Sequence, residues 1–259
     1  MNCGAAKTKD ARQLIVRGTG RAPKVTMSKT HYPVDAAHAM RELSRADRLL
    51  AKIIRRVGCF PTKKQKSQQP FASLLQAIVY QQLAGKAAAT IFGRVKALCA
   101  GDFPTPEEIL QLDETQLRGA GLSRQKIAAV KDLAAKTLDG TVPPLSKLRR
   151  MSEEEIHQRL TQVRGIGEWS VQMFLMFRLG RPDVLPIHDL GIRKGFQVVY
   201  GHKDIPKPQM ILEHGERWRP YRSIASWYLW RAADQKSGKP KVKAEAKPRT
   251  QLRSKRPSA

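Results

Sequence analysis

Apolar residues recur every three or four positions along most of the chain, as they do on one face of an α-helix. Residues 36–57 carry such a face, which predicts one amphipathic helix ending before Gly58. The pattern returns over residues 71–79 and 87–98, and the polar break at residues 81–85 predicts that these are two separate helices. Convincing strand alternation is absent. We therefore expect an all-α protein of about ten short helices.

Residues that cap helix N-termini mark further helix starts. Thr105 and Ser152 each precede an acid three positions later, the pattern of a capping box, and Ser123 is a simple cap. Residues 62–69 form a polar linker without a periodic apolar face. The later helices predicted in this way span residues 124–138, 190–200 and 220–233, with another that opens at residue 153.

A tight turn and an aspartate stand out between the later helices. Gly165 and Gly167 lie one residue apart before a predicted helix at residues 168–177, so the backbone can turn sharply and present N–H groups to an anion. The simpler alternative is that these glycines only make a tight turn between two helices. Asp189 follows about two dozen residues later, at the start of the next helix.

The charge balance favours the anion-binding interpretation. The chain of 259 residues has a formal net charge of +26, which predicts attraction to a polyanion, with nucleic acid as the leading candidate. Residues 1–30 carry +6 and residues 236–259 carry +8, which leaves +12 for the body of the protein. Both ends are poor in large apolar residues, so residues 1–35 and 236–259 are expected to be disordered and residues 36–235 to form the folded domain.

Other classes of protein are disfavoured by the same sequence. No run of 18 apolar residues predicts a membrane span, and the N-terminus lacks the apolar core of a secretory signal. Cys3, Cys59 and Cys99 are scattered and odd in number, which indicates neither a disulfide framework nor a zinc site. A reducing interior fits best.

Asp189 has a structural and a chemical interpretation. Aspartate is a preferred N-cap, and most aspartates at such places do nothing else. Backbone donors and the helix dipole also favour its ionised form, which could stabilise positive charge on a deoxyribose and orient a water. Such charge develops when an N-glycosidic bond is hydrolysed through an oxocarbenium-like state.

The chain resembles the helix-hairpin-helix (HhH-GPD) DNA glycosylase superfamily, and within it the 3-methyladenine DNA glycosylase II branch. The resemblance rests on G-I-G-E-W-S-V-Q-M from Gly165, R-P-D-V-L-P-I-H-D-L-G-I-R-K-G from Arg181 and Y-Q-Q-L-A-G-K-A-A from Tyr80. It extends to G-A-G-L-S-R-Q-K from Gly119 and W-R-P-Y-R-S-I-A-S-W-Y-L-W from Trp218. It implies two small helical subdomains flanking a base-binding cleft.

The activity implied is base excision repair: a damaged purine is flipped out of double-stranded DNA and its bond to the sugar is hydrolysed, leaving an abasic site. Asp189 falls on the family's catalytic aspartate. Trp169 stands where strand-cleaving relatives have a lysine, and an indole cannot form a Schiff base, so a monofunctional enzyme for alkylated purines is expected. A non-enzymatic HhH DNA-binding protein and a glycosylase for a mismatched or oxidised base are the alternatives.

The resemblance also implies roles for other residues. Trp169, Trp230, Met173 and Gln81 would line the base pocket, although any single tryptophan is more often core, and for Trp218 and Trp227 we prefer core packing. Gln82, with Leu83 beside it, would plug the gap left by the flipped base. The expected DNA contacts are Arg164, Gly165, Ile166, Gly167, Arg193, Lys194 and Arg222.

Family hairpins often hold a monovalent cation through main-chain carbonyls, which would fall here on Thr161, Val163 and Ile166. No cofactor and no iron–sulfur cluster are expected. The expected partner is double-stranded DNA with alkylated bases, no membrane is expected to be involved, and a monomer should suffice for base extraction. The expected location is the cytoplasm, at the nucleoid, in a bacterium and the nucleus in a eukaryote.

Overall fold

The computed structural model describes residues 35–61 and 69–236. Over these ranges it holds thirteen α-helices, one π-helix and one 3-10 helix and no strand, so the all-α prediction is confirmed. Two sequence predictions lie outside the described residues. These are the disorder of residues 1–34 and 237–259, and most of the polar linker at residues 62–69. None of the described helices is long and apolar enough to cross a membrane.

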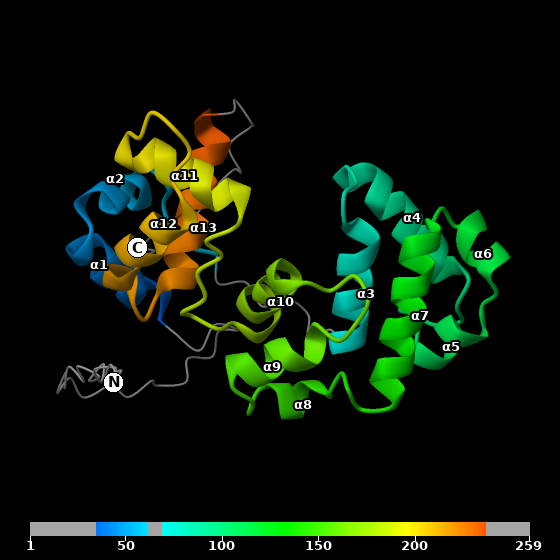
Figure 1. Cartoon of the computed structure of the whole chain (residues 1–259). Coiled ribbons are helices and arrows are strands. Elements are labelled where there is room, and N and C mark those ends of the chain that lie inside the picture. The colour runs from blue at the N-terminus through cyan, green and yellow to red at the C-terminus, as the bar shows by residue number, and fades with distance from the viewer. Residues whose placement is uncertain (1–34, 62–68, 237–259) are drawn as a thin grey trace, which may run out of the picture.

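The helices gather into two lobes, each with its own core (Figure 1). The middle lobe is one continuous stretch of chain, and the terminal lobe joins the first two described helices to the last ones. The middle lobe contains α3 (Pro70–Tyr80), α4 (Gly85–Ala97), α5 (Pro106–Gln111), α6 (Glu114–Gly119), α7 (Arg124–Leu138), α8 (Leu145–Leu148), α9 (Glu153–Leu160), α10 (Glu168–Phe174) and η1 (Leu175–Leu179). The terminal lobe contains α1 (Ala36–Ala46), α2 (Arg48–Val57), α11 (Leu190–Tyr200), α12 (Pro208–Gly215), η2 (Glu216–Trp218) and α13 (Arg222–Lys236).

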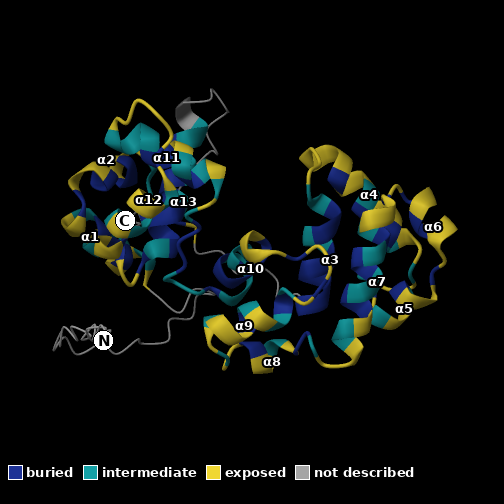
Figure 2. Ribbon diagram, viewed as in Figure 1, coloured by how far each residue is buried: buried dark blue, intermediate teal, exposed yellow. Residues whose placement is uncertain are grey.

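Buried residues form a separate dark region inside each lobe, and the loop between η1 and α11 connects the two (Figure 2). Trp230 packs against both cores. Trp218 is fully buried and Trp227 packs against the terminal-lobe core, so the core packing preferred for both residues is confirmed. The expected two subdomains are therefore present, with Trp230 at their junction.

The capping predictions hold in detail. Thr105 and Ser152 form capping boxes with Glu108 and Glu155, and Ser123 accepts a hydrogen bond from the Lys126 N–H at the start of α7. The predicted break between α3 and α4 is also present.

The prediction of a single helix over residues 36–57 is wrong. Asp47 interrupts it with extended backbone angles, φ −145° and ψ 107°. The Asp47 side chain accepts hydrogen bonds from the N–H groups of Leu49 and Leu50, each at 3.0 Å, and so starts a second helix. An apolar face continued across the break, which is why the periodicity alone did not reveal it.

The same Asp47 carboxylate binds three side chains from the other end of the chain. Its Oδ2 accepts from Tyr200 Oη at 2.5 Å and from Trp218 Nε1 at 3.1 Å, and it lies 2.9 Å from His214 Nε2. Burial opposes ionisation of Asp47, yet the hydrogen bonds, that of His214 first, outweigh it and hold the pKa of Asp47 well below its usual range. This buried carboxylate ties α1 and α2 to α11 and α12.

Two further helices differ in their bounds from the sequence prediction. The helix expected over residues 168–177 is α-helical only to Phe174 and continues as the π-helix Leu175–Leu179, a local widening common at functional sites. The last helix runs from Arg222 to Lys236 instead of over residues 220–233, and the residues before it form a turn in which the Tyr221 N–H donates to Trp218 O at 2.7 Å.

Candidate active site

The Asp189 carboxylate lies between two indole rings. Trp169 Nε1 donates to its Oδ2 at 2.7 Å, and Trp230 Nε1 donates to its Oδ1 at 2.7 Å. The Ile192 N–H also donates to Oδ1, at 2.8 Å, so Asp189 is the N-cap of α11 as predicted. Three hydrogen bonds from three directions fix the orientation of this carboxylate, which remains partly exposed.

These two tryptophans reach Asp189 from different lobes. Trp169 stands on the first turn of α10 in the middle lobe and is 51% exposed, unusual for so large an aromatic side chain. Trp230 comes from α13 in the terminal lobe and packs against the ring of Phe177, with centroids 5.8 Å apart. The site is therefore assembled where the two lobes meet.

A glycine makes the approach of Trp230 possible. A Cβ at Gly191 would lie 2.6 Å from Trp230 Cδ1 and 3.0 Å from Asp189 Oδ1, closer than side chains tolerate. One turn later, a Cβ at Gly195 would lie 2.0 Å from the backbone oxygen of Leu229. These glycines lie on one face of α11 and let α13 cross it closely enough for Trp230 to reach the carboxylate.

A hollow of about 660 Å³ opens beside Trp169, lined by α3, the turn after it, the hairpin and α10. Trp169, Met173 and Gln81 line it, and these are three of the four predicted base-pocket residues. Trp230 borders it only through Phe177, and Asp189 stands behind Trp169 instead of in its wall. The remaining lining is Ser73, Leu74, Gln76, Ala77, Tyr80, Gln82, Gly165, Ser170, Phe174, Phe177 and Arg178.

The turn between α3 and α4 lies at the mouth of this hollow. Gln82 has a left-handed backbone, φ 58°, and it and Leu83 are exposed at the tip. Gln81 points back instead, and its Nε2 donates to Gly165 O at 2.8 Å. Lys126 Nζ on α7 donates to Gln81 O at 2.9 Å, which fastens the base of the turn.

The hairpin adopts the conformation that its glycines predict. Gly165 has φ 78°, in the left-handed region that favours glycine, and Gly167 is the N-cap of α10. The Ile166 N–H is used within the turn by Val163 O at 3.0 Å, and the Arg164 N–H by Asp132 Oδ2 at 2.7 Å. Among the residues that the structure describes, no acceptor lies on the N–H groups of Gly165 and Gly167, so these two are open to an outside anion.

The carbonyls predicted to hold a cation lie on the same turn. Val163 O already accepts the Ile166 N–H, and the intervening Gln162 O accepts from Lys136 Nζ at 2.5 Å. Backbone oxygens suit a hard monovalent cation, but an ammonium group already contributes positive charge beside them. The cation site stays a prediction.

One predicted phosphate contact does not fit the structure. The guanidinium of Arg222 is 12% exposed and binds Asp183 at 2.8 Å and Glu216 at 3.2 Å, which makes it an internal ion-pair residue. Arg193 is half-buried and gives one bond to Pro206 O, and Lys194 is exposed. Charge alone could not separate these three basic residues, because the main acidic partner of Arg222, Asp183, lies 39 residues away in sequence.

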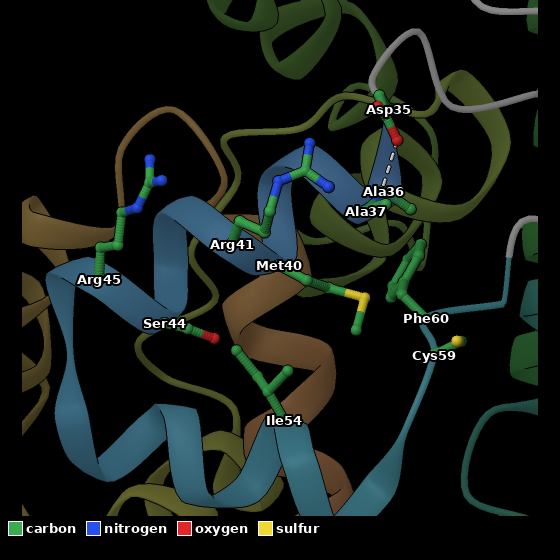
Figure 3. Close-up of a pocket in the computed structure, with 10 residues that line it drawn as sticks. All are labelled: Asp35, Ala36, Ala37, Met40, Arg41, Ser44, Arg45, Ile54, Cys59 and Phe60. Atoms are coloured by element: carbon green, nitrogen blue, oxygen red, sulfur yellow. Dashed lines mark hydrogen bonds between the residues drawn. The ribbon is translucent and has the colours of Figure 1, made fainter.

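A second hollow, of about 740 Å³, lies on the terminal lobe between α1 and the end of α2 (Figure 3). Met40, Ile54 and Phe60 make it apolar, and Asp35 at its edge caps α1. None of the predicted site residues lines it, whereas three of the predicted base-pocket residues line the hollow beside Trp169.

Comparison with known proteins identifies the family of this chain. Residues 75–220 match the family model described as the HhH-GPD superfamily base excision DNA repair protein. The chain belongs to the HhH-GPD superfamily. DNA-3-methyladenine glycosylase 1 of Schizosaccharomyces pombe is 39% identical over 193 residues, which cover 74% of this chain and 85% of that protein.

Solved HhH-GPD structures share the fold. A 3-methyladenine DNA glycosylase from S. pombe in complex with abasic DNA superposes with a TM-score of 0.69 at 39% identity, covering 75% of this chain and 95% of that chain. A DNA-3-methyladenine glycosidase from Bacillus halodurans gives a TM-score of 0.70 at 33% identity, covering 77% and 90%. The predicted helix-hairpin-helix glycosylase fold is therefore confirmed.

Several residues around this HhH-GPD site were not singled out from the sequence. Ser73, Gln76 and Arg178 bring polar groups to the hollow, and burial lowers the pKa of the Arg178 guanidinium from its ordinary value. Asp132 and Lys136 reach the hairpin from α7. Asp132 and Lys136 lie 32 and 26 residues before Arg164 and Gln162, the hairpin residues that they bind. No local sequence pattern predicts a contact over such a separation.

Proposed function

We propose that this protein is a monofunctional DNA glycosylase that removes alkylated purines, of the 3-methyladenine type, from double-stranded DNA and leaves an abasic site. The observation that carries the proposal is the Asp189 carboxylate held between Trp169 and Trp230, beside a hollow large enough for an extruded base. The similarity to proteins named as 3-methyladenine glycosylases supports the same substrate class.

Asp189 would act on the sugar and not on the base. As the N-glycosidic bond breaks, positive charge develops on the deoxyribose, and a fixed carboxylate beside it stabilises that charge without reorganising. The same carboxylate can orient the attacking water. The indole N–H groups of Trp169 and Trp230 hold it in place for both tasks.

The aromatic walls would select the base. A cationic alkylated purine is attracted to the electron-rich faces of aromatic rings, which Trp169, Tyr80 and Phe177 supply around the hollow. Because position 169 is a tryptophan, no amine stands there to form a Schiff base, and strand cleavage by that route is not expected.

The hairpin and the turn after α3 would hold the DNA. The open N–H groups of Gly165 and Gly167 in the hairpin would contact phosphates, together with the exposed side chains of Arg164 and Lys194. Gln82, at the exposed tip of the turn after α3, would fill the gap left in the duplex by the flipped base. A single protein molecule supplies every one of these groups.

The test is incubation with duplex DNA carrying 3-methyladenine or 7-methylguanine, followed by measurement of free bases and of alkali-labile abasic sites. The unaltered protein should release alkylated bases without breaking the strand at neutral pH. Asp189→Asn should slow release on the order of a hundredfold or more while duplex affinity persists.

Asp204→Asn is the matched control, because Asp204 is an exposed aspartate of the same lobe outside the site. The variant should keep full activity. Full activity of Asp189→Asn, or strand breaks made by the unaltered protein without alkali, would contradict the proposed mechanism.

A further inference from the structure

Helix α7 carries polar side chains along the side that faces the two proposed DNA-contacting turns. Lys126, Asp132 and Lys136 lie on one stripe of this helix, with Ala129 between them, over roughly 15 Å of helix length. α7 contributes five buried apolar residues to the middle-lobe core, so its position is set by packing. Each of the three polar side chains extends from this fixed helix to a backbone atom elsewhere.

The first of them fastens the turn after α3. Lys126 Nζ donates to Val79 O at 2.6 Å and to Gln81 O at 2.9 Å. These carbonyls belong to the last turn of α3 and the residue after it, where an ammonium group also interacts favourably with the helix dipole. The base of the turn carrying Gln82 is thereby held against α7.

The other two fasten the hairpin from both sides of its bend. Asp132 Oδ2 accepts the Arg164 N–H at 2.7 Å, and Lys136 Nζ donates to Gln162 O at 2.5 Å. Asp132 and Lys136 are themselves joined at 2.8 Å. The pair therefore supplies one acceptor and one donor, matched to the N–H and the C=O that flank Val163.

A direct contact closes the arrangement. Gln81 Nε2 donates to Gly165 O at 2.8 Å, so the turn after α3 and the hairpin are bound to each other as well as to α7. Ala129 lies against the hairpin too, since a Cβ on Gly165 would come within 3.3 Å of the Ala129 Cβ. The two turns cannot move apart without breaking several of these contacts.

We propose that Lys126, Asp132 and Lys136 are positioning residues that set the hairpin at a fixed distance from the plug turn, so that both engage one DNA duplex together. The inference rests on the proposed roles of the hairpin and of Gln82 in DNA binding. The three residues touch neither base nor sugar and act through the backbone of the turns. Their loss affects docking, and the chemistry at Asp189 continues once the duplex is bound.

Asp132→Ala tests the proposal through the direction in which duplex affinity changes. Removing a negative charge from a DNA-binding protein should strengthen duplex binding if only long-range electrostatics matter. Positioning predicts the opposite: about tenfold weaker binding to a duplex carrying an abasic-site analogue. The single-turnover rate of base release at saturating enzyme should stay within about twofold of that of the unaltered protein. This is the pattern expected when a change weakens binding of the ground state and the transition state equally.

Lys136→Met removes the second half of the clamp, and Lys131→Met is its matched control on the same helix, since Lys131 makes none of these bonds. Lys136→Met should bind several-fold more weakly than Lys131→Met, and Lys136→Arg should recover most of the loss. Combining Asp132→Ala with Lys136→Met should add little to either alone, because both break one clamp.

Gly167→Asp separates this inference from the proposed function. The position has an ordinary φ of −102° and open space around a Cβ, and aspartate is a good N-cap, so folding is preserved while a carboxylate faces the phosphate. If Gly167→Asp leaves binding intact, the hairpin is not the DNA contact and the proposed function fails at that point. The other outcome is that Gly167→Asp abolishes binding while Asp132→Ala and Lys136→Met both bind as tightly as Lys131→Met. If thermal melting shows that both of these variants are folded, that outcome overturns the positioning role.

Discussion

Gly191→Ala is a single-methyl change aimed at the centre of the proposed site. The added Cβ would lie 2.6 Å from Trp230 Cδ1, 2.9 Å from Trp230 Nε1 and 3.0 Å from Asp189 Oδ1. The indole cannot turn aside freely, because Phe177 packs against it and its N–H is bonded to the carboxylate. The helix backbone of α11 can move away from α13 only by giving up its close packing against Leu229 at Gly195, one turn away.

The size of the effect follows from these distances. Ordinary contact requires about 3.6 Å between such carbon atoms, so the ring or the helix must shift by about 1 Å. Overpacking of this kind lowers the free energy of unfolding by about 1 to 3 kcal/mol. A displacement of about 1 Å at reacting groups can slow catalysis on the order of a hundredfold, and the 2.7 Å bond from Trp230 to Asp189 is the first to break.

The assay is single-turnover release of an alkylated base at saturating enzyme, paired with chemical denaturation. Gly93→Ala is the control, because Gly93 lies inside α4 with nothing near its Cβ position. That variant should be slightly more stable, by about 0.5 to 1 kcal/mol, with an unchanged rate. Gly191→Ala should be less stable and much slower, at nearly unchanged affinity for duplex DNA.

A Gly191→Ala protein that releases bases within about twofold of the normal rate would refute the reasoning, since a hundredfold effect is expected. The Trp230 bond would then not control where the Asp189 carboxylate points. A loss of stability without a loss of rate would leave α11 and α13 as a packing contact only.

Three further changes give separate expectations. Trp169→Phe keeps an apolar ring but removes the donor to Asp189, so base release should slow about tenfold with duplex affinity unchanged; an equal rate would show that this bond is dispensable. Asp47→Asn should lower the free energy of unfolding by about 3 kcal/mol at pH 7. Because hydrogen bonds hold the pKa of Asp47 low, its stabilising effect is present above about pH 4 and is lost as the pH falls through that lowered pKa, so the difference in urea unfolding should shrink in acid; a constant difference would contradict this. Lys194→Gln should reduce the slope of log binding constant against log salt by about 1, whereas Arg222→Gln should lower the melting temperature and leave the slope unchanged; equal slopes for both variants would be the contrary result.

Structural features that depend on neighbouring residues could be predicted from the sequence. Ser123, Thr105 and Ser152 cap helices where their patterns predicted, because capping depends on residues within one turn. Asp189 caps α11 for the same reason, and the glycine spacing at Gly165 gave the hairpin. These features need no knowledge of the rest of the fold.

Contacts between segments that are distant along the chain could not be predicted from the sequence. Asp47 was hidden in an apolar period that continued across it, and its partners lie 153 to 171 residues away. Arg222 pairs with Asp183, 39 residues away, and this ion pair, which argues against the expected phosphate contact, could not be read from the sequence. The importance of Gly191 depends on where Trp230 stands, which only the crossing of α11 and α13 determines.

The order of the lobes along the chain has a consequence for biosynthesis. The middle lobe is continuous and can form as it leaves the ribosome, whereas α1 and α2 wait for helices made later. Asp47 precedes Tyr200 by 153 residues, which corresponds to roughly 8 to 30 seconds of translation. During that interval the inner face of α1 and α2 is not yet covered by α11 and α13, and a chain truncated before Trp218 lacks α13, which covers part of that face in the folded structure.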